Sequence, residues 1–83
     1  MTQKHYNVVV DFGVEMYDQE IIDVFADAIH VEDIGVDQYQ VGYGVFASSE
    51  QEAYRRGVNL VVAKLATVDV SETSWIDAVV YDE

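Results

Sequence analysis

Two hydrophobic periods alternate along the chain, and their order restricts the fold more than any other feature of the sequence. Over Tyr6–Phe12 apolar side chains recur at every second residue, which is the period of a strand with one buried face. The same period returns over Tyr39–Val45 and over Trp75–Tyr81. We expect strands in all three places, and a further short strand at Ile34 and Val36.

After the first strand the apolar spacing changes to that of a helix. Glu20 and Asp23 fall opposite the apolar residues, which gives the segment one apolar and one acidic face. Asp18 is suited to cap the start of this helix, and we expect the helix to end near His30. Its apolar face comprises Tyr17, Ile21, Phe25, Ala28 and Ile29.

A second helix is predicted to begin after Ser49. Ser49 and Glu52 form the S-x-x-E pattern of a capping box, in which each side chain satisfies a backbone N–H group at the helix start. Glu52 also precedes Arg56 by four residues, a spacing at which opposite charges pair along a helix. The apolar stripe of this helix comprises Tyr54, Val58, Val61, Val62, Leu65 and Val68.

The expected order is strand, helix, strand, strand, helix, strand, with a hairpin turn around Asp37 and Gln38. This order resembles the ferredoxin-like βαββαβ arrangement, in which two helices cover one face of a four-stranded antiparallel sheet. A chain of 83 residues has the size of one domain, so we expect residues 1–83 to form a single α+β domain. Because such folds serve many unrelated functions, function has to be argued from the surface.

Charge is the most unusual feature of the composition. Sixteen acidic residues stand against four basic ones, giving a formal net charge of −12. Contact with phosphate depends on Lys and Arg, so we expect no direct binding of nucleic acid and none to a membrane. The stretch Asp11–Glu52 holds eleven acids and neither Lys nor Arg. Such a surface suits a basic partner protein; the alternative is a surface that is acidic for solubility or for adaptation to salt.

We therefore hypothesise a non-catalytic domain that binds a basic surface of another protein and occludes its nucleic-acid site, as DNA-mimicking inhibitors from phages and other viruses do. On a helix, Glu20, Asp23 and Asp27 present roughly one charge per 5 Å, against about one per 3.4 Å along a DNA strand. A close imitation of DNA therefore needs further acids from the loops. The expected partner-binding residues are Glu20, Asp23, Asp27, Glu32, Asp33 and Asp37.

The sheet face away from the helices offers a second candidate surface. Exposed aromatic and aliphatic side chains on such a face exceed what a monomer usually leaves in water, so we expect a homodimer or a partner protein to cover it. A structural or small-ligand-binding oligomer is the alternative function, and terminal segments folded over the face are a third reading. The expected interface residues are Val9, Phe46, Trp75, Val79 and Tyr81.

Sequence patterns that carry chemistry are missing from the chain. It contains no cysteine, no nucleophile or phosphate-loop motif, and no calcium-loop spacing around Glu32, Asp33 and Asp37. We expect no enzymatic activity, no cofactor and no metal site. No apolar run is long enough for a signal peptide or a spanning helix, so a cytoplasmic location is expected.

Overall fold

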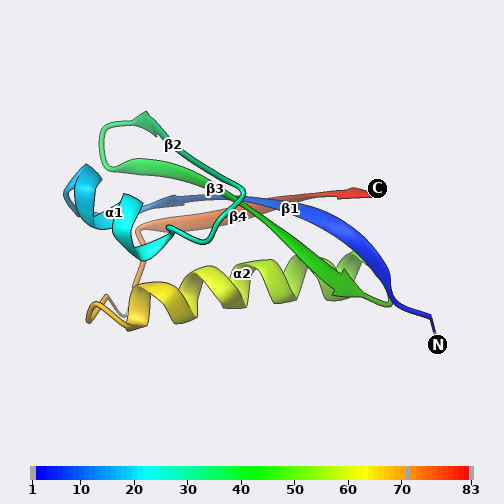
Figure 1. Cartoon of the computed structure of the whole chain (residues 1–83). Coiled ribbons are helices and arrows are strands. Elements are labelled where there is room, and N and C mark those ends of the chain that lie inside the picture. The colour runs from blue at the N-terminus through cyan, green and yellow to red at the C-terminus, as the bar shows by residue number, and fades with distance from the viewer. Residues whose placement is uncertain (1, 71, 83) are drawn as a thin grey trace.

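The computed structural model describes residues 2–70 and 72–82, in which the chain forms one antiparallel sheet of four strands and two helices (Figure 1). This confirms the α+β class. The strand order across the sheet is β2-β3-β1-β4. The elements are β1 (Lys4–Gly13), α1 (Asp18–Val24), β2 (His30–Gly35), β3 (Gln38–Ala47), α2 (Glu50–Ala66) and β4 (Trp75–Asp82).

Strand β1 lies in the interior of the sheet, because its alternating apolar residues are the most completely buried ones. Val8, Val10 and Phe12 have no exposed surface. Val8 pairs with Tyr43 of β3 on one side and with Val80 of β4 on the other. A strand that pairs on both sides and buries one face needs both an apolar alternation and unbroken backbone hydrogen bonding, and the sequence supplies both.

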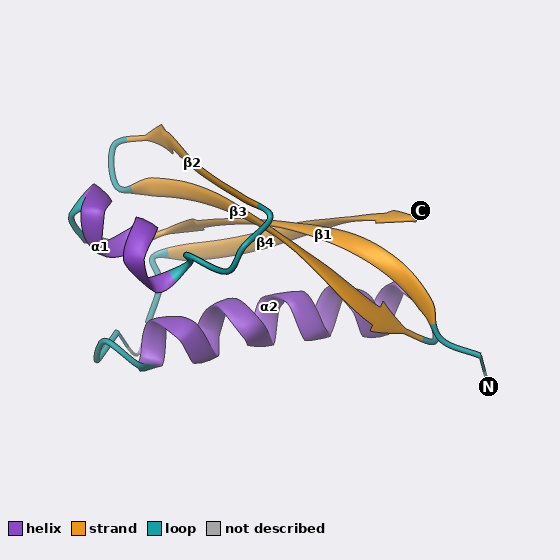
Figure 2. Cartoon of the chain, in the orientation of Figure 1, coloured by secondary structure: helices purple, strands orange, loops and turns teal. Residues whose placement is uncertain are grey.

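The hydrophobic core lies between the sheet and the two helices, which cover the same face (Figure 2). Helix α1 contributes Ile21 to this core. Phe25, the first residue after α1, packs with its ring centroid 5.5 Å from that of Phe12. None of the helices among the described residues is long and apolar enough to cross a membrane. The buried core residues are Tyr6, Val8, Val10, Phe12, Val14, Ile21, Phe25, Tyr39, Val41, Tyr43, Val45, Ala47, Ala53, Val61 and Leu65.

The predicted hairpin is present, but its first strand begins earlier than expected. β2 starts at His30 and runs to Gly35, and the two-residue turn is Val36 and Asp37. Asp37 adopts a φ of 54°, a left-handed conformation that aspartate tolerates better than most residues. The expectation that His30 ends a helix is therefore wrong, because this residue pairs with Gly42 of β3.

Helix α1 is much shorter than the apolar spacing predicts. It ends at Val24, and residues 25–29 turn the chain so that the Ile29 N–H can donate to the Gly42 carbonyl, 2.8 Å away. Hydrogen bonding to β3 thus replaces the helical hydrogen bonds that residues 25–29 would otherwise make. The prediction of Asp18 as the N-cap is also wrong: Tyr17 occupies that position without a side-chain cap, and Asp18 is the first helical residue.

Helix α2 begins as predicted but is rotated relative to the expected stripe. The Glu52 N–H donates to the Ser49 hydroxyl at 3.2 Å, which confirms Ser49 as the N-cap, while the Glu52 carboxylate accepts from the Ser48 hydroxyl at 2.7 Å. The fully buried helical positions are Ala53, Gly57, Val61 and Leu65, so Tyr54, Val62 and Val68 of the predicted stripe are left partly in water. The rotation has a steric cause, because small residues let the helix approach the sheet closely.

Gly57 is the point of closest approach. A Cβ atom at this position would lie 2.4 Å from Cγ1 of Val8, which is far inside van der Waals contact. Both partners are in the middle of long elements, so neither backbone can move alone. The absence of a side chain at Gly57 therefore determines how α2 is seated on the sheet.

Replacing Gly57 with alanine should destabilise the fold. Overpacking costs about 1–3 kcal/mol and the helix propensity of alanine returns about 1 kcal/mol, so we expect a net loss of up to ~2 kcal/mol. Urea unfolding followed by circular dichroism measures it. The control is Asn59→Ala at an exposed position of the same helix, which should be neutral or slightly stabilising. Equal stability of the two variants would contradict the packing argument.

Candidate protein-binding surface

Three connections of the chain meet at one end of the sheet. The Val14 N–H, just after β1, donates to the Asp37 carbonyl in the β2–β3 turn at 2.9 Å. The Ser74 N–H, just before β4, donates to the Gly13 carbonyl at the same distance. Residues that flank the strands at this end are thereby brought together from three distant parts of the sequence.

Acidic side chains line two adjoining hollows at this end. One hollow has a volume of about 550 Å³ and includes Glu15, Glu20 and Asp37 in its lining. The other, of about 540 Å³, includes Glu15 and Asp37 together with Asp69 and Glu72. The two hollows share Glu15 and Asp37, so they form one continuous surface. We define the acidic end by the carboxylates that line it, which are Glu15, Glu20, Asp37, Asp69 and Glu72.

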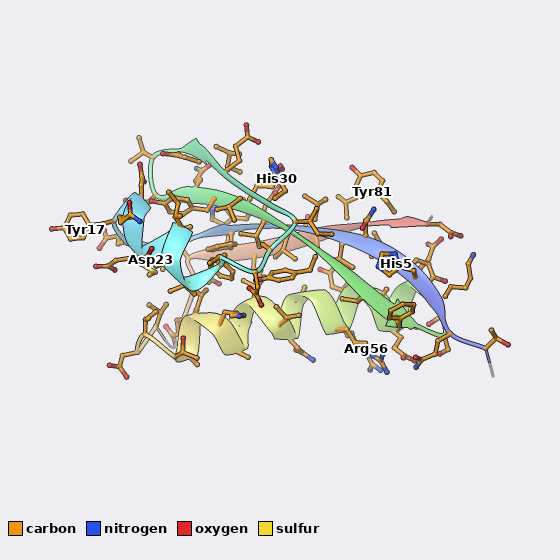
Figure 3. All side chains as sticks on the ribbon, viewed as in Figure 1. His5, Tyr17, Asp23, His30, Arg56 and Tyr81 are labelled. Carbon is orange, nitrogen blue, oxygen red and sulfur yellow. The ribbon has the colours of Figure 1, made fainter. Side chains whose placement is uncertain are left out.

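Lys4 and Arg56 are engaged away from the acidic end, whereas Lys64, in the last turn of α2, pairs with Asp27 at 2.9 Å. Lys4 pairs with Asp82 at 2.7 Å, and Arg56 pairs with Glu52 at 2.7 Å. The molecule measures 40 × 20 × 20 Å, and Figure 3 shows Asp23 at the end that holds α1 and Arg56 toward the opposite end. Lys4 and Arg56 therefore pair with carboxylates at the far end and not with those of the acidic end.

Of the six acids predicted to bind a partner, Glu20 and Asp37 belong to the acidic end. Asp23 is exposed on α1 close by, where its carboxylate accepts a hydrogen bond from Gln19 at 3.0 Å. Tyr17, 79% exposed, adds a large apolar side chain to the same rim. The structure thus places two of the six predicted acids at the acidic end and a third, Asp23, one helical turn from Glu20 on α1.

Asp27 is held within the fold. It lies after α1 rather than on it, accepts a hydrogen bond from the Tyr43 hydroxyl at 2.8 Å, and pairs with Lys64 of α2 at 2.9 Å. The hydrogen bond from Lys64, followed by that from Tyr43, lowers the pKa of Asp27. This carboxylate connects the turn after α1 to the sheet and to α2. The expectation that Asp27 continues the row of Glu20 and Asp23 along one helix is therefore wrong.

Glu32 and Asp33 point to other neighbours. Glu32 lies 3.3 Å from His30 Nε2, in a polar row that continues through Gln40 to Asp11 on the open sheet face. Asp33 accepts a hydrogen bond from the Gly35 N–H at 3.1 Å, across the irregularity in β2. Neither is among the residues that line the two hollows of the acidic end.

Tyr39 connects the acidic end to the core. Its ring is buried against Phe12, while its hydroxyl lies 2.7 Å from Asp18 and 3.0 Å from the Met16 carbonyl. Burial, the hydrogen bond to Asp18 and the neighbouring Asp33 and Asp37 raise the pKa of Tyr39 to about 12. The phenol therefore stays protonated and holds the loop before α1 in place.

Three carboxylates of this surface were not among the predicted ones: Glu15, Asp69 and Glu72. A signal for two of them exists in the sequence. Glu15 follows the first strand and Glu72 precedes the last one, and in an antiparallel sheet the end of one strand lies beside the start of its neighbour. Asp69, which follows α2 with a φ of 64°, gave no comparable signal.

The open face of the sheet carries the second set of predicted residues. Phe46, Val79 and Tyr81 are each more than half exposed, and Val9 and Trp75 are less so. Val9 and Val79 are directly paired, whereas the acidic pair Asp11 and Asp77 separates Val79 from Trp75. The five residues therefore form no single apolar patch.

A small hollow of about 220 Å³ interrupts the open face. Gly42 of β3 contributes to its floor, and Ile29, His30 and Tyr81 are among the side chains that line it. The neighbouring Gly44 is covered by His5, whose Nε2 lies 2.5 Å from the position a Cβ atom would take. The two glycines thus let side chains from other segments lie flat on the strand.

Alkaline pH should test the environment of Tyr39. Tyr39 has a pKa of about 12 in the folded chain against an ordinary value of 10.0. The protonated phenol therefore contributes fully to the free energy of unfolding below pH 10, and this contribution is lost as the pH rises through 12. Tyr39→Phe should remove the loss of unfolding free energy above pH 10 that ionisation of Tyr39 causes. It should also lower stability at neutral pH by about 1 kcal/mol, the usual value of one hydrogen bond.

Urea unfolding between pH 7 and pH 12 measures both effects. Tyr17→Phe is the control, since Tyr17 is exposed. If Tyr39→Phe loses stability above pH 10 as steeply as the unmodified chain does, the proposed environment is wrong.

No group of three or more His, Asp or Glu side chains within the described ranges is arranged to hold a metal ion. Comparison of the chain with protein-family models, with curated proteins and with solved structures gives no match.

Proposed function

We propose that this chain is a non-catalytic protein-interaction domain whose acidic end binds a basic surface of a partner protein. The observation that carries the proposal is the convergence of Glu15, Glu20 and Asp37 with Asp69 and Glu72 around two adjoining hollows. Carboxylates gathered from separate segments repel one another, so their assembly lowers stability unless a cationic surface offsets it. Exposed apolar side chains beside them, such as Tyr17, supply the contact area that charge alone lacks.

Occlusion of a nucleic-acid-binding site is the specific form of this function that we propose. The carboxylates of α1 alone are sparser than the phosphates of a DNA strand. Loop acids at the acidic end add negative charge to that of α1, which is what a competitor for a phosphate-binding surface requires. A partner that normally holds nucleic acid would present the Lys and Arg side chains that this surface lacks.

The fold that we infer for this function is ferredoxin-like. Two features support it: β3 lies between β1 and β2, and β1 lies between β3 and β4, so each helix connects two strands that are separated by a third. Helix α1 departs from the usual pattern by its length of seven residues. The short helix leaves the end of the sheet open, and the acidic end occupies that position.

A charge reversal with a matched control tests the proposed surface. Glu20→Lys changes the first turn of α1 and should weaken binding to a Lys- and Arg-rich peptide by about threefold to tenfold, with a steep dependence on salt. Glu50→Lys makes the same charge change in the first turn of α2, far from the acidic end, and should have a much smaller effect. Fluorescence anisotropy of the labelled peptide gives both dissociation constants.

The same experiment separates the proposal from general acidity. If both reversals weaken binding equally, the net charge of the molecule and not the acidic end attracts the peptide. Duplex DNA added to the preformed complex should displace the chain from the peptide, because both compete for the same cations. Failure of DNA to compete would exclude occlusion of a nucleic-acid site.

The open sheet face supports a second candidate function, a homo-oligomeric or small-ligand-binding module. The favouring observation is the hollow beside Tyr81, which is lined largely by apolar groups. If this face is covered by another copy or by a ligand, Tyr81→Ser should change the mass in solution or abolish binding of an apolar fluorescent dye. An unchanged mass and unchanged dye binding would leave the acidic end as the functional surface.

A further inference from the structure

The outer edge of β4 is one of the two free edges of the sheet, because β2 and β4 are its outer strands. The Gly42 carbonyl points toward β2, where it lies 2.8 Å from the Ile29 nitrogen. Backbone hydrogen bonding alternates in direction along antiparallel strands, so Val9, the pairing partner of Gly42, directs its N–H and C=O groups toward β4 and bonds to Val79. The N–H and C=O groups of Ile76, Ala78 and Val80 are consequently directed away from β1, toward the free edge. An edge of this length is a template for another strand.

Apolar side chains flank this edge on the helix side as well. Tyr54 is 38% exposed and Val62 46% exposed, with Val58 between them on the same side of α2. Gly57 packs on Val8, the pairing partner of Val80, so this part of α2 lies beside β4. We call Tyr54, Val58 and Val62 the α2 strip. It is the part of the predicted apolar stripe within α2 that the core does not bury.

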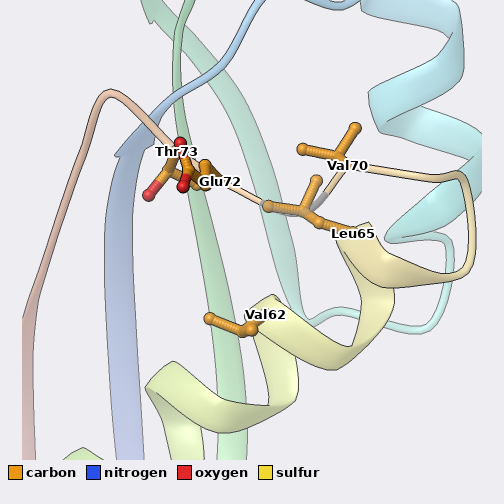
Figure 4. A pocket seen from close by; sticks show the side chains of 5 residues that line it. All are labelled: Val62, Leu65, Val70, Glu72 and Thr73. Atoms are coloured by element: carbon orange, nitrogen blue, oxygen red, sulfur yellow. The ribbon is translucent and has the colours of Figure 1, made fainter.

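A pocket of about 250 Å³ extends the α2 strip at its C-terminal end (Figure 4). Val62, Leu65 and Val70 form its apolar wall. Glu72 and Thr73, from the loop before β4, form the other side. The pocket and the exposed Tyr54 ring thus lie toward opposite ends of one strip.

We propose that two copies of this chain pair antiparallel through β4, with a two-fold axis at Ala78. Such an axis sets the α2 strips antiparallel, so that Tyr54 of one copy faces Val62 and the pocket of the other. Each copy supplies both the protruding aromatic ring and the pocket, which is the self-complementarity that an isologous dimer requires. The two sheets join into one continuous sheet with the helices on the same face.

The register around Ala78 is favourable for every side chain along the edge. Residues whose numbers add to 156 face each other, which places Trp75 opposite Tyr81 and Ile76 opposite Val80. Asp77 faces Val79, so no carboxylate opposes another. Aromatic and β-branched cross-strand pairs of this kind stabilise antiparallel sheets.

Long-range charge also favours a second copy in this orientation. Arg55 makes no ion pair within residues 2–70 and 72–82, whereas Lys4, Arg56 and Lys64 each make one. Antiparallel pairing brings the N-terminal half of α2, with Arg55, alongside the C-terminal end of the other α2, where Asp69 and Glu72 lie. The two acidic ends point in opposite directions, and Asp69 and Glu72 are their carboxylates nearest the other copy.

Asp77 sets the strength of this pairing. Its carboxylate accepts a hydrogen bond from the Ala78 N–H at 2.8 Å and lies 3.4 Å from the Tyr54 hydroxyl. Edge pairing needs the Ala78 N–H and the Tyr54 ring has to face the other copy, so the Asp77 side chain has to rotate away before the edges join. The carboxylate therefore limits association to moderate affinity, as charged residues on edge strands do.

Sedimentation of the full chain over a range of concentrations tests the proposal. We expect a reversible dimer of twice the 9.4 kDa chain mass. Ala78→Pro should give a monomer, since the lost N–H points outward and β1–β4 pairing is kept. Val62→Glu should raise the dimer dissociation constant at least tenfold, whereas Ala63→Glu, exposed on the far side of the same helix, should leave it unchanged.

Two further variants identify the surface. Asp77→Ala should tighten the dimer by about tenfold, because one competing hydrogen bond is removed in each copy. Phe46→Glu on the open sheet face should have no effect. A chain that stays monomeric at all concentrations overturns the proposal. So does a dimer that survives Ala78→Pro and dissociates with Phe46→Glu. Circular dichroism confirms that each variant is folded.

Discussion

Close contact between α2 and β1 at Gly57 determines how the rest of the molecule is arranged. Because Gly57 has no side chain, the helix backbone rests on Val8, and the buried side of α2 becomes the row of Ala53, Gly57, Val61 and Leu65. Larger apolar residues of the helix are displaced to the side of β4. The same contact therefore builds the core and leaves the α2 strip beside an unpaired sheet edge.

The sequence was informative where one local signal decides a structure. Alternation over Tyr6–Phe12 and Trp75–Tyr81 predicted two strands that differ from the observed ones by one or two residues. The Ser49–Glu52 capping box located the start of α2. In each case the propensity, the hydrophobic pattern and the hydrogen bonding of the backbone favour the same conformation, so no tertiary contact has to override them.

Errors arose where a tertiary contact decides between two locally acceptable structures. Residues 25–29 have helical spacing, but hydrogen bonding of Ile29 to Gly42 and of Asp27 to Tyr43 draws them into a turn. Helical periodicity also does not reveal how a helix is rotated when small residues approach the sheet. The acidic end illustrates the same limit, since Asp69 joins Glu15 and Asp37 only through the folded loops. A list of acids in the sequence cannot tell those that bind within the fold, such as Asp27, from those that face solvent.

The central claim is that the acidic end, and no other part of this acidic molecule, meets cationic protein surface. Amide chemical-shift mapping by NMR during titration with a Lys- and Arg-rich peptide tests it most directly. We predict saturable shifts confined to residues 14–20, 36–38 and 69–74, and none around Arg56 or on the open sheet face. Shifts spread evenly over all exposed carboxylates, or concentrated on the sheet face, would contradict the account.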